Sequence, residues 1–414
     1  MGDDRAFRLG AGLDSVAGGP ISVAPFVSDA YFEREKALWR QSWLAVGREA
    51  DVAKPNSYFT ADIDVVHASV IVVRGKDGAL RAFHNVCTHR AGRILCDTAK
   101  KGRAAFLTCP FHGWVFDTDG ELRNIPKEGI FTQGCDKAAL ALKPVHVATW
   151  GGFVFINLAE TPAHSLEQHM AGVPANLEPY LRDRPWTWYA GYRHVFDANW
   201  KDLMNIQHEG YHASVLHADT LAVDFAPQDC ANTLFPDSPG VSSLLTVSRP
   251  VPPPGVTWTP TPIQDVAQRN GRTSNWVDND TSVASRDFPG AVNHEQSDRW
   301  VFDCYTIFPN LLIFAGASVV SVMRVLPISA HQTIWDWDWY FDHAPETFGE
   351  KFNLEHGRIA TRNALAQDWG IIDLVHANMR AGVVDTIHIA NEMEATVAAL
   401  YERVVKAVPL QEGR

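Results

Sequence analysis

The chain has 414 residues, which is enough for two domains that each bury a core. Its 48 acidic residues outnumber 36 basic ones, for a net charge of −12, and without a basic run we exclude a nucleic-acid partner. No apolar run approaches the roughly 18 residues of a membrane span, and Met1–Phe7 lack the charged-then-apolar layout of a signal peptide. We therefore expect a cytoplasmic protein in which patterned cysteines bind metal rather than form disulfides.

The first 158 residues indicate one helix followed by a small all-β domain. Residues 28–43 carry apolar side chains at helical spacing behind candidate capping residues. From residue 44 onward short β-rich runs alternate with turn signals, as in residues 69–74, 115–120 and 151–156. We place an N-terminal helical segment, which packs on the C-terminal domain, at 1–43 and the β domain at 44–158.

Residues 159–414 mix both element types and predict a larger α+β domain. We expect helices near 199–213, 360–380 and 391–407, and strands near 192–197, 241–248, 300–307, 311–325 and 331–341. In the last of these, tryptophans at 335, 337 and 339 alternate with aspartates, as in a sheet with one apolar and one polar face. The Pro-rich segment 250–262 and the polar stretch to about 298 read as long loops, which in enzymes often cover a site.

The strongest motif is a pair of turns that each supply one Cys and one His. Cys87 and His89 point the same way in an extended segment, and after nineteen further residues Cys109 and His112 flank a tight turn. Zinc also binds two thiolates and two imidazoles, but zinc fingers usually group like ligands, whereas each half here is Cys then His. This order suits a Rieske [2Fe–2S] centre, in which one iron takes both thiolates and the other takes both imidazoles.

The remaining cysteines show no paired spacing, and we interpret them as buried structural thiols: Cys96, Cys135, Cys230 and Cys304.

A second group of metal-ligating side chains follows Asn199, although a solvated helix face is the alternative explanation. His208, Glu209, His212 and His217 fall within ten residues. On an ideal helix His212 and His217 would lie about 140° apart, so joint ligation requires the helix to end or bulge between them. His208 and His212 are four residues apart and could share a metal without distortion, which makes them the rival pair.

Asp368 is the candidate carboxylate that would complete a 2-His-1-carboxylate ferrous site. It lies in the middle of an apolar helical stripe that includes Leu365 and Ile372. A carboxylate on a buried face is costly unless it is paired or metal-bound, and a salt bridge to an arginine is the alternative. Such a site keeps open positions for O2, with the organic substrate beside them.

These motifs resemble those of the α subunits of Rieske non-haem iron ring-hydroxylating oxygenases. The resemblance covers Cys87–Gly92 and Cys109–Trp114, the Glu-Gly-Tyr-His-(four residues)-His run that ends at His217, and Gln367-Asp368-(four residues)-Asp373, where the family usually has Glu in place of Asp373. It implies that Cys87, His89, Cys109 and His112 hold the cluster, and that His212, His217 and Asp368 hold Fe(II). It also implies that an antiparallel sheet covered by helices, of the helix-grip type, follows the Rieske domain.

The resemblance further implies how the two centres communicate. The family assembles as a trimer, with or without a small β subunit, and the cluster of one protomer lies next to the iron of its neighbour. Glu209 matches the acidic residue that links a cluster imidazole to His212, and a surface carboxylate is the alternative. The sequence departs from the family at Asp202, Ile206 and Gln207, where Leu, Asn and an aromatic residue are usual, which bears on water and product handling near the metal.

These features predict a terminal oxygenase that mono- or cis-dihydroxylates an aromatic substrate, in aromatic hydrocarbon catabolism. Within the same fold, the alternative is oxidative N- or O-demethylation or hydroxylation of a small non-aromatic amine. In a different class, the alternative is an electron-transfer iron–sulfur or zinc protein. Because the chain carries no dinucleotide fingerprint, electrons would come from NAD(P)H through a separate flavin-dependent reductase, directly or through a ferredoxin.

Overall fold

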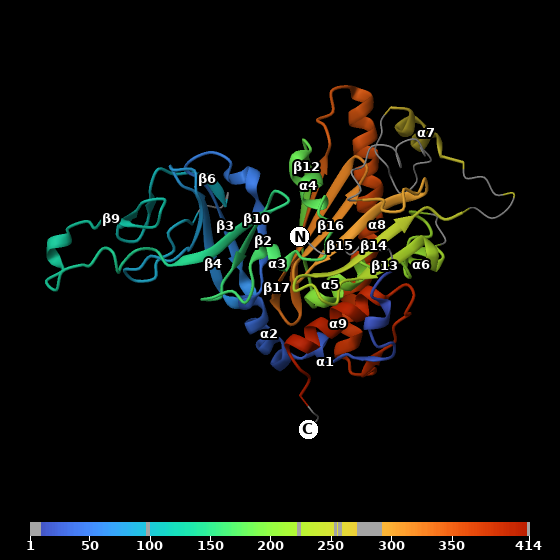
Figure 1. The fold of residues 1–414 in the computed structure, drawn as a ribbon, viewed down its shortest axis with the longest axis horizontal. Helices are drawn as coiled ribbons and strands as arrows, with labels where there is room; N and C mark the ends of the chain where they lie inside the picture. The colour runs from blue at the N-terminus through green and yellow to red at the C-terminus, as the bar shows by residue number, and fades with distance from the viewer. Residues whose placement is uncertain are drawn as a thin grey trace, which may run out of the picture. The chain divides into compact units, whose positions relative to one another are not determined.

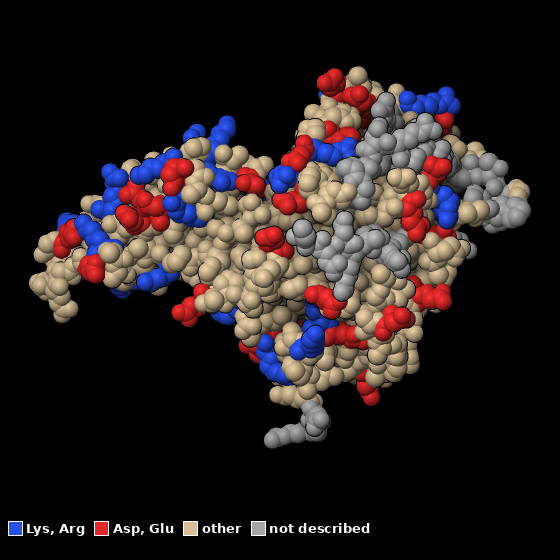
Figure 2. Space-filling view, in the orientation of Figure 1, with Lys and Arg blue, Asp and Glu red and all other residues tan. Residues whose placement is uncertain are grey.

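A computed structural model of the chain describes residues 10–96, 100–221, 225–251, 255, 259–270 and 292–411. The chain divides into two compact units, one formed by Met1–Glu35 with Gln168–Arg414 and the other by Lys36–Glu167 (Figure 1). Residues 1–9, on which the expected absence of a signal peptide rests, lie outside the described residues. On the face shown in Figure 2, acidic and basic side chains are interspersed.

The unit Lys36–Glu167 is built on β-strands, as the sequence predicts, with three short 3-10 helices between them and helical residues at its two ends. Helix α2 (Asp29–Gln41) leads into an antiparallel sheet with the strand order β2-β11-β10-β5-β4-β3-β6. These strands are β2 (Leu44–Arg48), β3 (Ser57–Ile63), β4 (Ala68–Arg74), β5 (Leu80–His84), β6 (Lys101–Arg103), β10 (Pro144–Trp150) and β11 (Phe153–Asn157). A second, three-stranded sheet consists of β7 (Leu107–Thr108), β8 (Val115–Phe116) and β9 (Leu122–Asn124). The turns that carry Cys87 and Cys109 pack on a core shared by both sheets.

The larger unit is built on a seven-stranded antiparallel sheet with the order β12-β18-β17-β16-β15-β14-β13. Its strands are β12 (Thr187–Phe196), β13 (Cys230–Leu234), β14 (Val241–Ser248), β15 (Trp300–Ile307), β16 (Leu311–Gly316), β17 (Val319–Ser329) and β18 (Gln332–Phe341). Trp335, Trp337 and Trp339 of β18 are buried on one face, while Asp336 and Asp338 meet arginines on the other, so the predicted alternation is confirmed. A small pair of strands, β1 (Ile21–Ser22) and β19 (Thr386–Ile387), lies apart from this sheet.

Two expectations about this unit are wrong. The single strand expected at 311–325 is a hairpin, because the chain turns at Ala317 and Ser318 within an otherwise continuous apolar run. The loop expected around 250–298 contains helix α7 (Pro262–Arg269), which a Thr261 and Gln264 capping box initiates. Much of that loop, including residues 271–291, lies outside the described residues.

Helices surround the sheet of the larger unit (Figure 1). They are α1 (Ala24–Val27), α3 (Leu166–His169), α4 (Leu177–Asp183), α5 (Trp200–Gln207), α6 (Ala213–Leu216), α8 (Phe348–Arg380) and α9 (Ala395–Ala407). Helix α8 begins at a capping box of Thr347 and Glu350, twelve residues before the expected start, and its 33 residues span about 50 Å. Helix α9 packs on β13 and β14, and α5 packs on β17 and α8. This helix-on-sheet arrangement confirms the predicted fold class.

Among the described residues, no helix combines the length and the apolarity needed to cross a membrane.

Candidate metal centres

The first site of interest lies where helix α5 ends and the chain turns into α6. Asn199 caps α5, and the Asp202 carboxylate accepts a hydrogen bond from the Asn199 backbone at 3.1 Å. The predicted helix at 199–213 is therefore interrupted: α5 stops at Gln207, and α6 begins only at Ala213. His212 and His217 flank the single helical turn of α6, and His217 leaves helical geometry with φ −101° and ψ 16°. On a continuous helix the spacing of five would point His212 and His217 apart. Here α6 begins directly after His212 and ends directly before His217, which allows both side chains to reach a common point.

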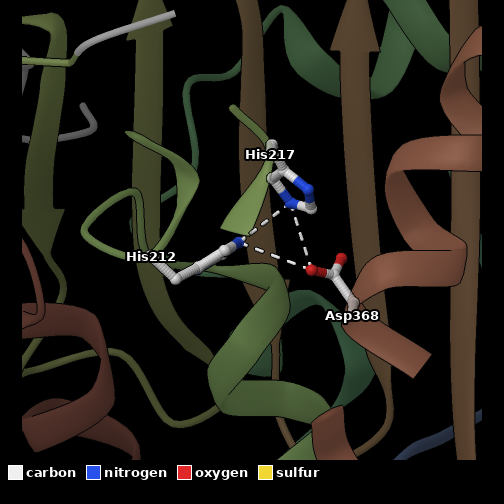
Figure 3. Close-up of side chains that lie close together, drawn as sticks. All are labelled: His212, His217 and Asp368. Carbon is white, nitrogen blue, oxygen red and sulfur yellow. Dashed lines mark hydrogen bonds and ion pairs between the residues drawn. The ribbon is translucent and has the colours of Figure 1, made fainter. Parts of the chain in front are cut away.

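His212 and His217 converge with Asp368, which projects from the middle of α8 (Figure 3). The Nε2 atoms of the two histidines are 3.2 Å apart, and Asp368 Oδ1 lies 3.1 Å from His217 Nε2 and 3.6 Å from His212 Nε2. With metal–ligand distances of about 2.1 Å, two ligands at 90° are about 3.0 Å apart and two at 180° about 4.2 Å. The separations of 3.1 and 3.2 Å are close to the first value, and the separation of 3.6 Å is midway between the two. No pair lies on opposite sides of a common centre, so the three donor atoms can bind one side of a metal ion, as in a 2-His-1-carboxylate triad.

The charge on Asp368 supports this use of the site. The residue is 3% exposed, and its Oδ1 accepts no hydrogen bond from the described part of the chain. The ion pairs of Asp368 among the described residues involve histidines, and none involves an arginine or lysine. A buried carboxylate without such a partner is costly, and a divalent cation at the triad would offset that cost. Asp373, one turn further along α8, instead accepts a hydrogen bond from the Asp197 backbone.

Each side chain of the triad has an outer partner that orients it. Glu209 Oε1 faces His212 Nδ1, and Glu209 Oε2 accepts hydrogen bonds from the backbone N–H groups of Tyr211 and His212. Gln367 Oε1 lies 3.0 Å from His217 Nδ1. Such contacts fix the imidazole tautomer that presents a free Nε2 to a metal. Glu209 is one of the residues expected from the sequence, whereas Gln367 entered there only as a letter of the motif around Asp368, without a role.

Three carboxylates act on the pKa of His212. Burial by itself would lower the pKa of His212, but the hydrogen bond and negative charge of Glu209, together with Asp368 and Glu394, outweigh burial and raise it. Burial and the charge of Glu209 raise the pKa of Glu394, so the two carboxylates are close enough to repel each other. Glu394, which sequence reasoning missed, comes from the segment that enters α9.

His208 lies elsewhere. Its ring is fully buried, its Nδ1 is 3.1 Å from Thr306 Oγ1, and burial lowers its pKa to about 3. The structure therefore brings His212 together with His217 and Asp368, and it does not bring His208 to them. The reason is the end of α5 at Gln207, after which positions four residues apart no longer share a face.

A cavity opens beside the triad, between the sheet and α8. Its wall on the sheet includes an in-register row in which Phe314 of β16, Ser321 of β17 and Trp339 of β18 lie side by side. Three further aromatic rings also face it, from Phe225, Phe302 and Phe341. None of the described lining residues is a lysine or an arginine. Cys230 also lines the cavity, and burial raises its pKa to about 12, so its thiol is neutral.

The second site lies wholly in the unit Lys36–Glu167, where the four predicted cluster residues meet. Cys87 and Cys109 are buried at adjoining turns, and the rings of His89 and His112 have centroids 4.7 Å apart. Gly113, with φ +70°, makes the turn between Cys109 and Trp114. A Cβ on Gly92 would lie 3.2 Å from the Cys109 sulfur, so the glycine lets the backbone pass close to that sulfur.

The donor atoms of this second site fit a Rieske cluster. Burial and the neighbouring Cys109 sulfur raise the pKa of the Cys87 thiol, so two thiolates could share the place only with metal cations between them. Burial, with the nearby His112 and Arg90, lowers the pKa of His89 and keeps its imidazole neutral, the form that binds metal. His89 Nδ1 is buried and has no hydrogen-bond partner among the described residues, which leaves this nitrogen free for a metal.

The cysteines outside these turns do not all match expectation. Cys230 and Cys304 are buried and Cys135 is half-buried, but Cys96 is exposed, so its interpretation as a buried thiol is wrong. It lies in the loop that leads toward β6, and its sulfur contacts the Arg93 carbonyl oxygen at 3.5 Å.

Comparison with known proteins gives two family matches. Residues 42–134 match the Rieske [2Fe-2S] domain, and residues 183–410, more than half of the chain, match the ring hydroxylating alpha subunit (catalytic domain). The oxygenase subunit of carnitine monooxygenase from Acinetobacter baumannii is 26% identical over 360 residues, which are 86% of this chain and 84% of that protein. The oxygenase subunit of glycine betaine monooxygenase from Chromohalobacter salexigens is 35% identical over 199 residues, which are 48% of this chain and 43% of that protein.

Solved structures share the fold across most of the chain. The quaternary ammonium Rieske monooxygenase CntA in complex with L-carnitine gives a TM-score of 0.71 at 23% identity, covering 95% of this chain and 96% of that one. Naphthalene 1,2-dioxygenase from a Rhodococcus species also gives 0.71, at 19% identity and 94% coverage of both chains. The fold alone therefore does not separate the two substrate classes.

The relatives correct the leading functional expectation. The similar oxygenase subunits are named for carnitine and glycine betaine, not for aromatic hydrocarbons, so the predictions of aromatic hydroxylation and of a role in aromatic hydrocarbon catabolism are wrong. They favour instead the alternative, oxidation of a small non-aromatic amine. Oxygenases of this kind use a [2Fe–2S] cluster and a mononuclear iron, and they need a reductase partner and a small-molecule substrate. The chain belongs to the family of ring-hydroxylating oxygenase α subunits, and is a Rieske non-haem iron oxygenase.

Proposed function

We propose that this chain is the oxygenase component of a monooxygenase that acts on a small quaternary ammonium compound. The observation that carries the proposal is the cavity beside the triad, which is lined by aromatic rings and, among its described residues, by no basic side chain. The faces of aromatic rings attract a quaternary ammonium group, by about 2 kcal/mol or more when the site is desolvated. The names of the relatives support this choice over an aromatic substrate, which the same rings would also accommodate.

We assign His212, His217 and Asp368 as the side chains that hold the mononuclear iron, and Cys87, His89, Cys109 and His112 as those that hold the cluster. When bound, the ferrous ion activates O2, so that one oxygen atom enters a C–H bond and the other leaves as water, with two electrons and two protons supplied. The protein orients His212 and His217 through Glu209 and Gln367, so that both present Nε2 toward Asp368 Oδ1.

The cavity walls have the complementary role. Phe314 of β16 and Trp339 of β18 would hold the cationic head group, and the packed strands around them keep bulk water from the C–H bond beside the triad. A buried carboxylate that is not assigned to the metal, Glu209, also lines the cavity, and its charge favours a cation over a neutral molecule of equal size.

Electrons are proposed to come from NAD(P)H through a separate flavin-dependent reductase, directly or through a ferredoxin. We propose further that the chain assembles as a trimer, with or without a β subunit. The cluster of one protomer would then reach the triad of its neighbour through Glu209, whose carboxylate already contacts His212.

The test is a coupled assay with purified oxygenase and a compatible reductase, in which NADH consumption and product mass are followed together. Choline, glycine betaine and carnitine are compared with 3,3-dimethylbutan-1-ol, the neutral carbon isostere of choline, and with naphthalene and benzoate. We expect a cationic compound to give product in step with NADH use and the neutral isostere to give little. Product from an aromatic compound, with none from any quaternary ammonium compound, would refute the proposal.

A further inference from the structure

Gln207, one of the positions where the sequence departs from its family, contacts the triad directly. It is the last residue of α5, and its side chain is buried at the edge of the cavity. Its Nε2 donates a hydrogen bond to Asp368 Oδ2 at 3.0 Å. The other carboxylate oxygen, Oδ1, faces the two histidines. The two oxygens of Asp368 therefore have different surroundings.

We propose that Gln207 is a positioning residue that makes Asp368 a single-oxygen ligand, with Oδ1 on the iron and Oδ2 held away from it. The inference rests on the proposed ligand set of His212, His217 and Asp368. It adds what that set leaves open, namely how many positions on the metal the carboxylate occupies.

The chemistry of the amide supports this role. A carboxylate accepts hydrogen bonds and donates none, so only the NH2 end of the Gln207 side chain can face Asp368. A hydrogen bond to an ionised acceptor is stronger than a neutral one, and Asp368 is buried without a lysine or arginine partner among the described residues. Only Oδ1 lies near the histidine nitrogens, so binding through both oxygens would require the carboxylate to turn Oδ2 from its present place beside Gln207 toward the metal.

The bond also joins two helices that are far apart in the chain. Gln207 ends α5, and Asp368 lies 161 residues later on α8. Gln367, the neighbour of Asp368 on α8, points to His217 instead. The three triad side chains thus each have one outer partner, and Gln207 is the partner of the carboxylate.

The number of carboxylate oxygens on the metal changes what remains for other ligands. Two imidazoles and one oxygen leave three positions of six, and a second carboxylate oxygen would leave two. Loss of Gln207 would therefore alter the coordination of any divalent metal at the triad, whether or not the enzyme turns over.

The experiment uses the full-length chain with its oxidised cluster, which is EPR-silent, after the mononuclear site has been emptied with a chelator and loaded with Co²⁺. High-spin Co²⁺ reports its coordination by EPR, and crystals of the loaded protein show which Asp368 oxygens lie within bonding distance. Gln207→Leu removes the amide at similar volume, and Gln207→Asn keeps an amide that is too short to reach Asp368. Ile206→Val is the matched control, because Ile206 lines the same cavity at the same helix end.

We expect both Gln207 variants to change the Co²⁺ EPR spectrum and to show both Asp368 oxygens near the metal, while Ile206→Val keeps the wild-type spectrum and one oxygen. Superimposable spectra for wild type, Gln207→Leu and Gln207→Asn would overturn the role of Gln207. Failure of the ligand set itself is distinguishable, because then Asp368→Ala would bind Co²⁺ as tightly as wild type. If Gln207→Leu does not fold, Gln207→Asn decides the question by the same two measurements.

Discussion

Replacement of Glu209 by Gln tests the link between the triad and its surroundings most directly. Three N–H groups point at the Glu209 carboxylate: those of the Tyr211 and His212 backbones at Oε2, and the Nδ1–H of His212 at Oε1. A carboxylate can accept from all three, whereas a glutamine has one oxygen and must turn its NH2 group toward at least one donor.

The cost follows from burial. The Glu209 side chain is 8% exposed, so a donor left without an acceptor there costs about 1 to 3 kcal/mol. That energy corresponds to a factor of about 5 to 150 in an equilibrium constant, close to the roughly 10- to 100-fold loss typical when an outer partner of a metal ligand is removed. We therefore expect Glu209→Gln to keep its cluster, and its iron at saturating Fe²⁺, but to bind Fe²⁺ about 10- to 100-fold more weakly and to turn over far more slowly.

The assay combines anaerobic Fe²⁺ titration with a single turnover, in which reduced protein is mixed with O2 and substrate and cluster oxidation is followed by absorbance. Glu394→Gln is the matched control, because it removes a carboxylate whose charge acts on His212 but whose hydrogen bond is to the Ala390 backbone. Wild-type Fe²⁺ affinity and wild-type cluster oxidation in Glu209→Gln would refute the reasoning, since the three donors would then need no common acceptor.

Three further predictions concern the cavity, pH and the cluster. Trp339→Leu should raise the KM for the cationic substrate about 5- to 30-fold, the equivalent of about 1 to 2 kcal/mol of cation–π attraction. Trp337→Leu, on the same strand but outside the cavity, should leave this KM unchanged. Equal KM values in both variants would contradict this. Burial lowers the pKa of His208 to about 3 in the folded protein. Its contribution to stability is therefore complete above the unfolded pKa of about 6.5 and is lost as pH falls, so wild type should lose about 2 kcal/mol between pH 8 and pH 5 that His208→Gln keeps. Parallel thermal melts of the two proteins at both pH values check the difference, and identical shifts would exclude this role. Cys87→Ser should abolish the visible absorbance and EPR signal of the reduced cluster while Fe²⁺ binding at the triad persists. Cys96→Ser, at an exposed cysteine, should keep both the cluster signals and Fe²⁺ binding. Loss of the cluster signals in both variants would argue that the cysteines act through folding.

Local patterns carried much of the architecture. Period-two alternation in residues 332–341 and apolar runs such as Val241–Ser248 identify strands whatever their partners, because each strand must bury one face or both. The Cys-x-His and Cys-x-x-His turns place their ligands within a few residues, so their chemistry is readable before the fold is known. The hairpin at Ala317 and Ser318 escaped this reasoning because its turn lies inside an apolar run with little polar punctuation.

Sequence spacing alone left the geometry of the triad open, because it depends on where a helix stops. A continuous helix at 199–213 would favour His208 with His212, and the end of α5 at Gln207 instead brings His212 to His217. The end of α5 at Gln207 is a tertiary effect. The backbone carbonyl of His208 accepts a hydrogen bond from the Thr396 hydroxyl, and His208 Nδ1 lies 3.1 Å from Thr306 Oγ1, so residues from two distant elements hold the chain in its turn.

By itself the sequence determined the family and the four cysteine and histidine residues of the cluster turns, because both rest on short motifs. It indicated Asp368 through a buried charge within an apolar stripe, and it indicated His217 as the partner of His212 only through the resemblance to the family. The tertiary structure alone decided the outer partners Gln207 and Gln367, the nearby charge of Glu394 and the aromatic wall of the cavity. Those residues come from strands and helices far apart in the chain, and their proximity depends on sheet register and on the path of α8, which no local pattern encodes.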